Sequence, residues 1–83
     1  MSERRVVAWH MPQLGNGVET AVIQSWLVEV GAAVTVGETI VVVETDKVTS
    51  DLESPVTGTL VLQAAQEGDE LEIGERLAEF EVA

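Results

Sequence analysis

The feature that most restricts the fold of this chain is an internal repeat with an offset of 37 residues. When residues 30–44 are aligned with residues 67–81, glycines, acidic residues and apolar residues fall in one register. The matching pairs are Gly31/Gly68, Gly37/Gly74, Glu38/Glu75, Glu44/Glu81, Val34/Leu71, Val36/Ile73, Ile40/Leu77 and Val43/Phe80, with Thr20/Thr57 and Ile23/Leu60 upstream. Two similar halves in so short a chain share one core. The repeat therefore predicts two small layers packed face to face with quasi-twofold symmetry.

Each half consists of short apolar runs rich in valine, which favours strands over helices. The runs span residues 6–9, 21–28, 40–43, 60–62 and 77–82. Glycines lie at the turn positions between these runs. The prediction is one all-β domain over residues 1–83, a flattened barrel or sandwich of two four-stranded antiparallel sheets. The segment around residues 45–56 joins the halves, and we expect it to turn at a corner of the molecule.

Composition excludes several function classes. Fifteen acidic residues against four basic ones give a formal net charge of −11, which repels nucleic-acid backbones and anionic membranes. The chain has no cysteine, so it offers no disulfide, thiolate nucleophile or zinc–thiolate site. A single histidine, His10, cannot by itself build a metal cluster. No apolar run approaches the roughly 18 residues of a membrane span, and the first residues show no signal-peptide pattern.

Lys47 is the residue that stands out chemically, because it is the only lysine in the chain. It follows Asp46 between two extended stretches, where a tight turn is expected, and an aspartate can cap a backbone N–H there. A lysine at the tip of a hairpin has the geometry needed to attach a cofactor through an amide. The alternative is that Lys47 only makes the turn soluble. Trp9, Trp26 and His10 are expected to be structural.

The residues around Lys47 resemble a known motif. Residues 44–48, Glu-Thr-Asp-Lys-Val, are similar to the lipoylation motif of lipoyl domains in the acyltransferase component of 2-oxo acid dehydrogenase complexes. The resemblance continues in Met-Pro-Gln-Leu-Gly-Asn-Gly-Val at 11–18, Trp-Leu-Val-Glu-Val-Gly at 26–31, Ser-Pro-Val-Thr-Gly at 54–58 and Glu-Gly-Asp at 67–69. Gly31 and Gly58 stand 16 residues before and 11 residues after Lys47, as in the family pattern.

This resemblance implies a barrel-sandwich hybrid fold and lipoic acid bound covalently to Lys47, with Asp46, Val48, Gly31 and Gly58 shaping the turn. It implies a carrier that catalyses nothing itself. The lipoyl-lysine would act as a swinging arm for acyl groups and reducing equivalents. Its partners would be a thiamine-diphosphate-dependent decarboxylase (E1), the acyltransferase core and dihydrolipoyl dehydrogenase (E3). A lipoate ligase or an octanoyl transferase would modify it.

The resemblance also implies that the loop around residues 15–17 lies beside the lipoyl turn. The chain departs from the family pattern at Asn16, usually acidic, at Ala32, often aspartate, and at Val48, often alanine. These departures bear on partner recognition and not on the cofactor.

Two other readings stay open. Biotinyl domains share the fold, although their lysine lies between methionines, and a β-sandwich without a cofactor could serve protein interaction alone. The lipoylated carrier of glycine cleavage is longer and has additional helices. We expect a monomeric N-terminal domain of a longer, cytoplasmic, prokaryotic acyltransferase. Pyruvate, 2-oxoglutarate and branched-chain 2-oxo acids all remain open as substrates of the parent enzyme.

Overall fold

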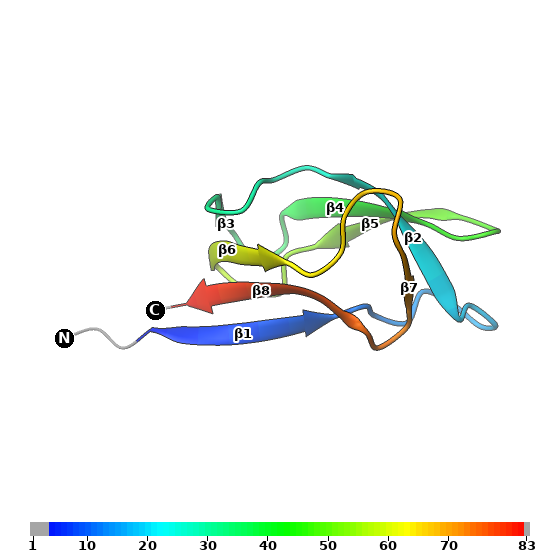
Figure 1. Cartoon of the computed structure of the whole chain (residues 1–83), viewed down its shortest axis with the longest axis horizontal. Coiled ribbons are helices and arrows are strands. Elements are labelled where there is room, and N and C mark those ends of the chain that lie inside the picture. Colours follow the sequence, from blue (N-terminus) through cyan, green and yellow to red (C-terminus); the bar gives the residue numbers. More distant parts are fainter. Residues whose placement is uncertain (1–3, 83) are drawn as a thin grey trace.

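The computed structural model describes residues 4–82 and contains eight strands in two sheets (Figure 1). The strands are β1 (Arg5–His10), β2 (Thr20–Trp26), β3 (Ala33–Val34), β4 (Thr39–Glu44), β5 (Thr49–Glu53), β6 (Gly58–Gln63), β7 (Glu70–Glu72) and β8 (Arg76–Val82). One sheet has the order β1-β8-β6-β3 and the other β5-β4-β2-β7, with antiparallel pairing throughout. No helix occurs within residues 4–82. The predicted all-β fold with two four-stranded antiparallel sheets is confirmed.

The internal repeat is a true structural symmetry. Strands β2, β3 and β4 of the first half correspond to β6, β7 and β8 of the second, and each set contributes to both sheets. Gly31 donates its N–H to the carbonyl of Leu60 at 2.7 Å, and Gly68 donates to Ile23 at 2.8 Å. Both glycines have positive φ, 98° and 93°, a conformation that side chains rarely adopt. Two equivalent backbone hydrogen bonds, one from each half, therefore join the halves.

Two side chains form a second pair of equivalent hydrogen bonds between the halves. The indole Nε1–H of Trp26 donates to the carbonyl of Ala65 at 2.9 Å. The amide Nε2–H of Gln63 donates to the carbonyl of Val28 at 3.0 Å. Trp26 and Gln63 are equivalent positions of the repeat, and each donates to a backbone carbonyl in the loop that follows the equivalent strand of the other half.

The core lies between the two sheets and is built from the matched apolar positions. Both members of the pairs Ile23/Leu60, Ile40/Leu77 and Val43/Phe80 are buried. The ring of Trp9 packs against Phe80 with the ring centroids 5.7 Å apart, and Trp26 also packs against the core. Both tryptophans are structural, as predicted. Strands β3, β5 and β7 were not among the predicted runs. Strands β3 and β7 have only two or three residues and give no measurable period, and β5 has a single apolar residue, Leu52.

The molecule has two distinct ends. Arg5 of β1 pairs with Val82 of β8, so both ends of the described chain lie together. The turn between β4 and β5 lies at the opposite end of the molecule (Figure 1). This turn joins the two halves, as expected, and contains Lys47.

Candidate functional site

The turn that carries Lys47 is a tight connection between β4 and β5. Glu44 and Thr49 form the last paired position of the hairpin, and the N–H of Thr45 donates to the carbonyl of Val48 at 2.8 Å. The Thr45 hydroxyl oxygen accepts the backbone N–H of Lys47 at 3.3 Å and of Val48 at 3.1 Å. The same hydroxyl donates to the Val48 carbonyl at 3.1 Å. One threonine side chain therefore organises the whole turn.

This role of Thr45 replaces the one expected of Asp46. The Asp46 side chain is exposed and makes no hydrogen bond within residues 4–82. The threonine competes successfully because its hydroxyl can accept and donate at once, whereas a carboxylate only accepts. A threonine two residues before a turn lysine is the signal that would have predicted this.

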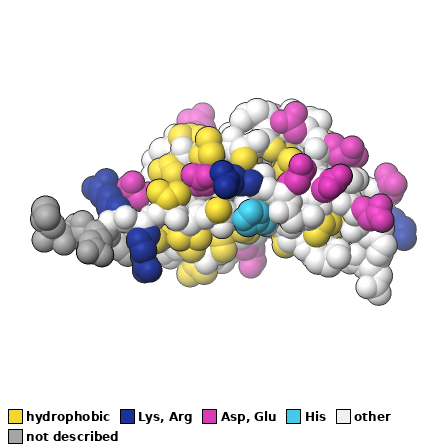
Figure 2. All heavy atoms as spheres, turned by 60° about the horizontal axis from the view of Figure 1, so that its bottom comes forward, with side chains coloured by type: hydrophobic (Ala, Val, Ile, Leu, Met, Phe, Trp, Pro, Cys, Tyr) yellow, Lys and Arg dark blue, Asp and Glu magenta, His cyan; other side chains and the backbone are white. Residues whose placement is uncertain are grey.

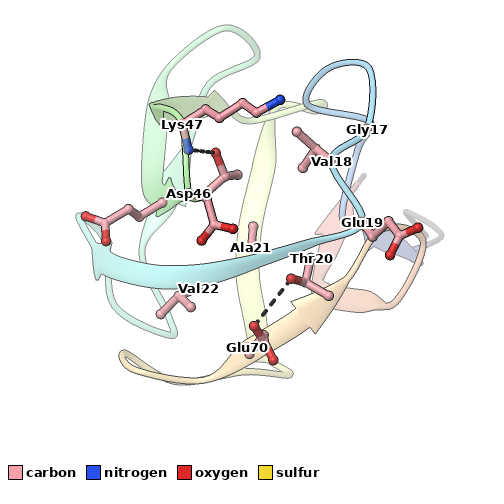
Figure 3. A pocket seen from close by; sticks show the side chains of 11 residues that line it. Gly17, Val18, Glu19, Thr20, Ala21, Val22, Asp46, Lys47 and Glu70 are labelled. Atoms are coloured by element: carbon pink, nitrogen blue, oxygen red, sulfur yellow. Dashed lines mark hydrogen bonds between the residues drawn. The ribbon is translucent and has the colours of Figure 1, made fainter.

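Lys47 itself is exposed. Its amine forms no ion pair or hydrogen bond in the described part of the chain, where both salt bridges involve arginine. Its side chain extends from the hairpin toward the loop at Gly17 and Val18 (Figure 3). The primary amine is therefore free to react with an external acyl donor.

A groove of about 260 Å³ lies beside this lysine. Its lining comes from the loop before β2, from β2, from the end of β4 with the β4–β5 turn, and from β7: Gly17, Val18, Glu19, Thr20, Ala21, Val22, Glu44, Thr45, Asp46, Lys47 and Glu70. The expectation that the loop around residues 15–17 lies beside the lysine turn is confirmed by Gly17 in this lining. Thr20 donates its hydroxyl to Glu70 at 3.3 Å between the neighbouring strands β2 and β7 (Figure 3).

The groove is strongly acidic. Four of its lining residues are carboxylates, Glu19, Glu44, Asp46 and Glu70, and Lys47 is the single cation. Acidic side chains also gather over the end of the molecule away from the chain termini, on the face shown in Figure 2. Like charges this close favour a basic surface on any docking partner.

Gly31 and Gly58 lie elsewhere. Neither lines the groove, and Gly31 serves the junction between the halves through its bond to Leu60. Gly58 lies in β6 beside Glu81 of β8, near the chain ends. The repeat offset matches Gly58 to Ala21, which does line the groove. Gly58 therefore occupies the symmetry-equivalent position at the other end, and neither glycine contacts the Lys47 turn through the hydrogen bonds described.

The remaining sequence candidates have structural surroundings. His10 is the exposed last residue of β1, and its Nδ1 lies 3.0 Å from the carbonyl oxygen of Gly74. Within residues 4–82, no three histidine or acidic side chains are grouped so that they could hold a metal ion. No helix of the described chain is long and apolar enough to span a membrane.

The fold and the site together define a class of protein, a small β-domain that presents one free lysine at the tip of a hairpin. The family model described as "Biotin-requiring enzyme", which covers biotinyl and lipoyl domains, matches residues 8–80. The chain therefore belongs to the biotin/lipoyl carrier family, as the sequence resemblance predicted.

Curated relatives refine this membership. The chain is 45% identical over 62 residues to the dihydrolipoyllysine-residue acetyltransferase component of the pyruvate dehydrogenase complex of Acholeplasma laidlawii, covering 75% of this chain and 11% of the relative. It is 41% identical over 71 residues to the dihydrolipoyllysine-residue succinyltransferase component of the 2-oxoglutarate dehydrogenase complex of Bartonella vinsonii, covering 86% of this chain and 17% of the relative.

A third relative belongs to another complex. The lipoamide acyltransferase component of the branched-chain alpha-keto acid dehydrogenase complex of Bacillus subtilis is 39% identical over 71 residues, covering 86% of this chain and 17% of the relative. The chain thus spans between a tenth and a fifth of the length of these relatives. It corresponds to their carrier domain and not to a whole acyltransferase.

Proposed function

We propose that this chain is a lipoyl carrier domain in which Lys47 holds lipoic acid through an amide on its side-chain nitrogen. The observation that supports this most directly is the position of Lys47. It is the only lysine of the chain, its amine is exposed and free of partners within residues 4–82, and it lies in the segment matched by the carrier family.

The residues of the turn suit this attachment. An amide to Lys47 needs an amine that can enter the active site of a modifying enzyme. Lys47 is exposed in the four-residue connection between the last paired residues of the hairpin, Glu44 and Thr49. Thr45 holds the backbone at Lys47 and Val48, which fixes the point at which the Lys47 side chain leaves the turn. The bound lipoyl group would supply disulfide–dithiol exchange, which carries acyl groups and reducing equivalents.

The partners follow from the names of the relatives. The chain would belong to a longer acyltransferase and serve a decarboxylase, the acyltransferase core and dihydrolipoyl dehydrogenase in turn, in a bacterial cytoplasmic complex. Both described chain ends lie at the opposite end of the molecule from the β4–β5 turn (Figure 1), so a tether would leave the arm unobstructed. Tethering by a flexible linker raises the effective concentration at the partner sites to the order of mM.

Biotin is the second candidate cofactor, because the matching family model is described as "Biotin-requiring enzyme". The relatives are named for lipoyllysine or lipoamide, and Asp46 and Val48 flank the lysine where biotinyl domains have methionines. Intact mass of protein from cells distinguishes a lipoyl from a biotinyl adduct, and a streptavidin blot detects only the latter.

The direct test is incubation of the domain with lipoate ligase, ATP and lipoate. The amide removes one positive charge from a protein of formal net charge −11, so modified protein moves faster on a native gel. Lys47→Arg is the matched control, because it keeps the charge and offers no amine that forms this amide. Modification of the Lys47→Arg variant, or no modification of the unaltered domain, would refute the assignment.

A further inference from the structure

The loop that faces Lys47 contains the only asparagine of the chain, Asn16, followed directly by Gly17. Gly15 to Val18 form a β-turn closed by the N–H of Val18 donating to the carbonyl of Gly15 at 3.2 Å. Gly17 has a φ of 78°, which the third position of a type II turn requires. We propose that Asn16 is a site of spontaneous deamidation, which places a new carboxylate beside the groove of Lys47.

The reaction uses only this chain and water. The backbone nitrogen of Gly17 attacks Cγ of Asn16, the C–N bond of the carboxamide breaks, and ammonia leaves with the proton from Gly17. Water then adds to either carbonyl of the resulting five-membered succinimide. Opening at one carbonyl gives an aspartyl residue, and opening at the other gives an isoaspartyl residue whose backbone runs through the former side chain. No oxidation or reduction takes place.

The local structure favours this attack. Asn16 and Gly17 are exposed, so water reaches both. Apart from the chain neighbours, no heavy atom lies within 4 Å of the place where a Cβ of Gly17 would be, so the loop is open on that side of Gly17. In the described part of the chain, the Gly17 N–H donates no hydrogen bond.

Few hydrogen bonds hold the turn around Asn16. The Gln13 side-chain oxygen accepts the N–H of Leu14 at 3.0 Å and of Gly15 at 3.3 Å. Neither of these two bonds involves the Asn16–Gly17 peptide. Only the bond from the Val18 N–H to the Gly15 carbonyl spans it. The rotation that brings Cγ of Asn16 to the Gly17 nitrogen therefore breaks one backbone hydrogen bond of the loop.

The product matters because of its position. Gly17 and Val18 line the same groove as Lys47, and Val18 lies opposite the lysine side chain (Figure 3). An aspartyl residue adds one negative charge next to a groove that already contains four carboxylates. An isoaspartyl residue also lengthens the backbone by one methylene group. With that insertion, the Val18 N–H can no longer form its hydrogen bond to the Gly15 carbonyl in the same turn.

The test is mass spectrometry of the folded domain held in warm, mildly alkaline buffer. We expect each chain to gain one NH-to-O mass difference with time, and fragment spectra to place it at Asn16. Part of the product should accept a methyl group from protein isoaspartate methyltransferase. The mass change should be simple to assign, because none of the three aspartates or four glutamines precedes a glycine.

Asn16→Gln is the matched control, since its longer side chain must close a six-membered ring and should remain unchanged over the same period. Asn16→Asp gives the mass and mobility standard for the aspartyl product. A folded domain that gains no mass would overturn the proposal. A gain that appears only in urea, or appears equally in Asn16→Gln, would overturn it as well. None of these readouts depends on a cofactor at Lys47.

Discussion

The hydroxyl of Thr45 accepts the backbone N–H of Lys47 at 3.3 Å, so a side chain two positions earlier holds the backbone of the candidate attachment lysine. The same hydroxyl accepts the N–H of Val48 and donates to the Val48 carbonyl. The backbone at Lys47 is thus held by a neutral side chain within the turn, and Lys47 forms no ion pair with a nearby carboxylate in the described part of the chain.

The first prediction concerns this hydroxyl. Thr45→Val keeps the shape of the side chain but removes three hydrogen bonds, so we expect the free energy of unfolding to fall by about 1 kcal/mol. The turn should also become less ordered, which lowers the rate of lipoyl attachment. Thr45→Ser is the control and should attach at nearly the unaltered rate. Urea unfolding and ligase kinetics measure the two effects, and equal attachment rates for all three proteins would contradict the prediction.

The second prediction concerns position within the turn. The paired exchange Asp46→Lys with Lys47→Asp preserves composition and net charge but moves the amine by one residue. The side chains of neighbouring residues point in different directions. The amine would therefore no longer extend from position 47, whose backbone N–H is held by Thr45. We expect a folded protein that is modified far more slowly, measured by intact mass against time. Attachment at the unaltered rate would show that a ligase reads local sequence instead of presentation.

The third prediction concerns Gly58. A Cβ there would overlap the carbonyl oxygen of Glu81 in the neighbouring strand. We therefore expect Gly58→Val to lower the free energy of unfolding by about 1–3 kcal/mol, the usual cost of overpacking. Thr59→Val, in the same strand, should have little effect. Because Gly58 is remote from Lys47, the folded fraction should still accept the lipoyl group, and a specific loss of attachment would contradict this placement.

The fourth prediction uses the imperfection of the symmetry. The Asp69 carboxylate accepts the N–H of Gln66 at 2.9 Å, whereas Ala32, its equivalent, offers no acceptor to Glu29. Asp69→Ala should lower the free energy of unfolding by about 1 kcal/mol. Ala32→Asn should raise it by a similar amount, because it supplies the missing acceptor without adding charge.

Ala32→Asp separates the effect of the hydrogen-bond acceptor at this position from the effect of an added negative charge. It adds the same acceptor and one more negative charge to a chain of formal net charge −11, so its gain should be smaller than that of Ala32→Asn and should increase with salt. Chemical unfolding at low and high ionic strength measures both. A loss of stability in the asparagine variant would show that the two turns are not equivalent.

The repeat and the valine-rich runs were enough to predict the fold, because a 37-residue register ties Ile23 to Leu60 and Val43 to Phe80, and all four side chains are buried. Lys47 could be selected as the candidate attachment residue because it is the only lysine of the chain.

The surroundings of Lys47 were less predictable. The family resemblance implied that Gly31 and Gly58 shape the turn, but distance along the chain does not report which end of a strand a residue occupies. Glu70 reaches the groove through the three-residue strand β7, which pairs with β2 across about 50 residues of sequence. Such pairings depend on the packing of the whole molecule and leave no local pattern.

The adjacency of Arg5 and Val82 has an engineering consequence. The symmetry that relates β4 to β8 also relates β5 to β1, so the gap between the chain ends is the counterpart of the Lys47 turn. Joining Val82 to Arg5 with a copy of residues 45–48 would close the backbone into a ring with a hairpin at each pole. New termini could then be opened in an exposed loop, as circular permutation usually tolerates. Such a permutant would offer two attachment lysines at opposite poles of a single core.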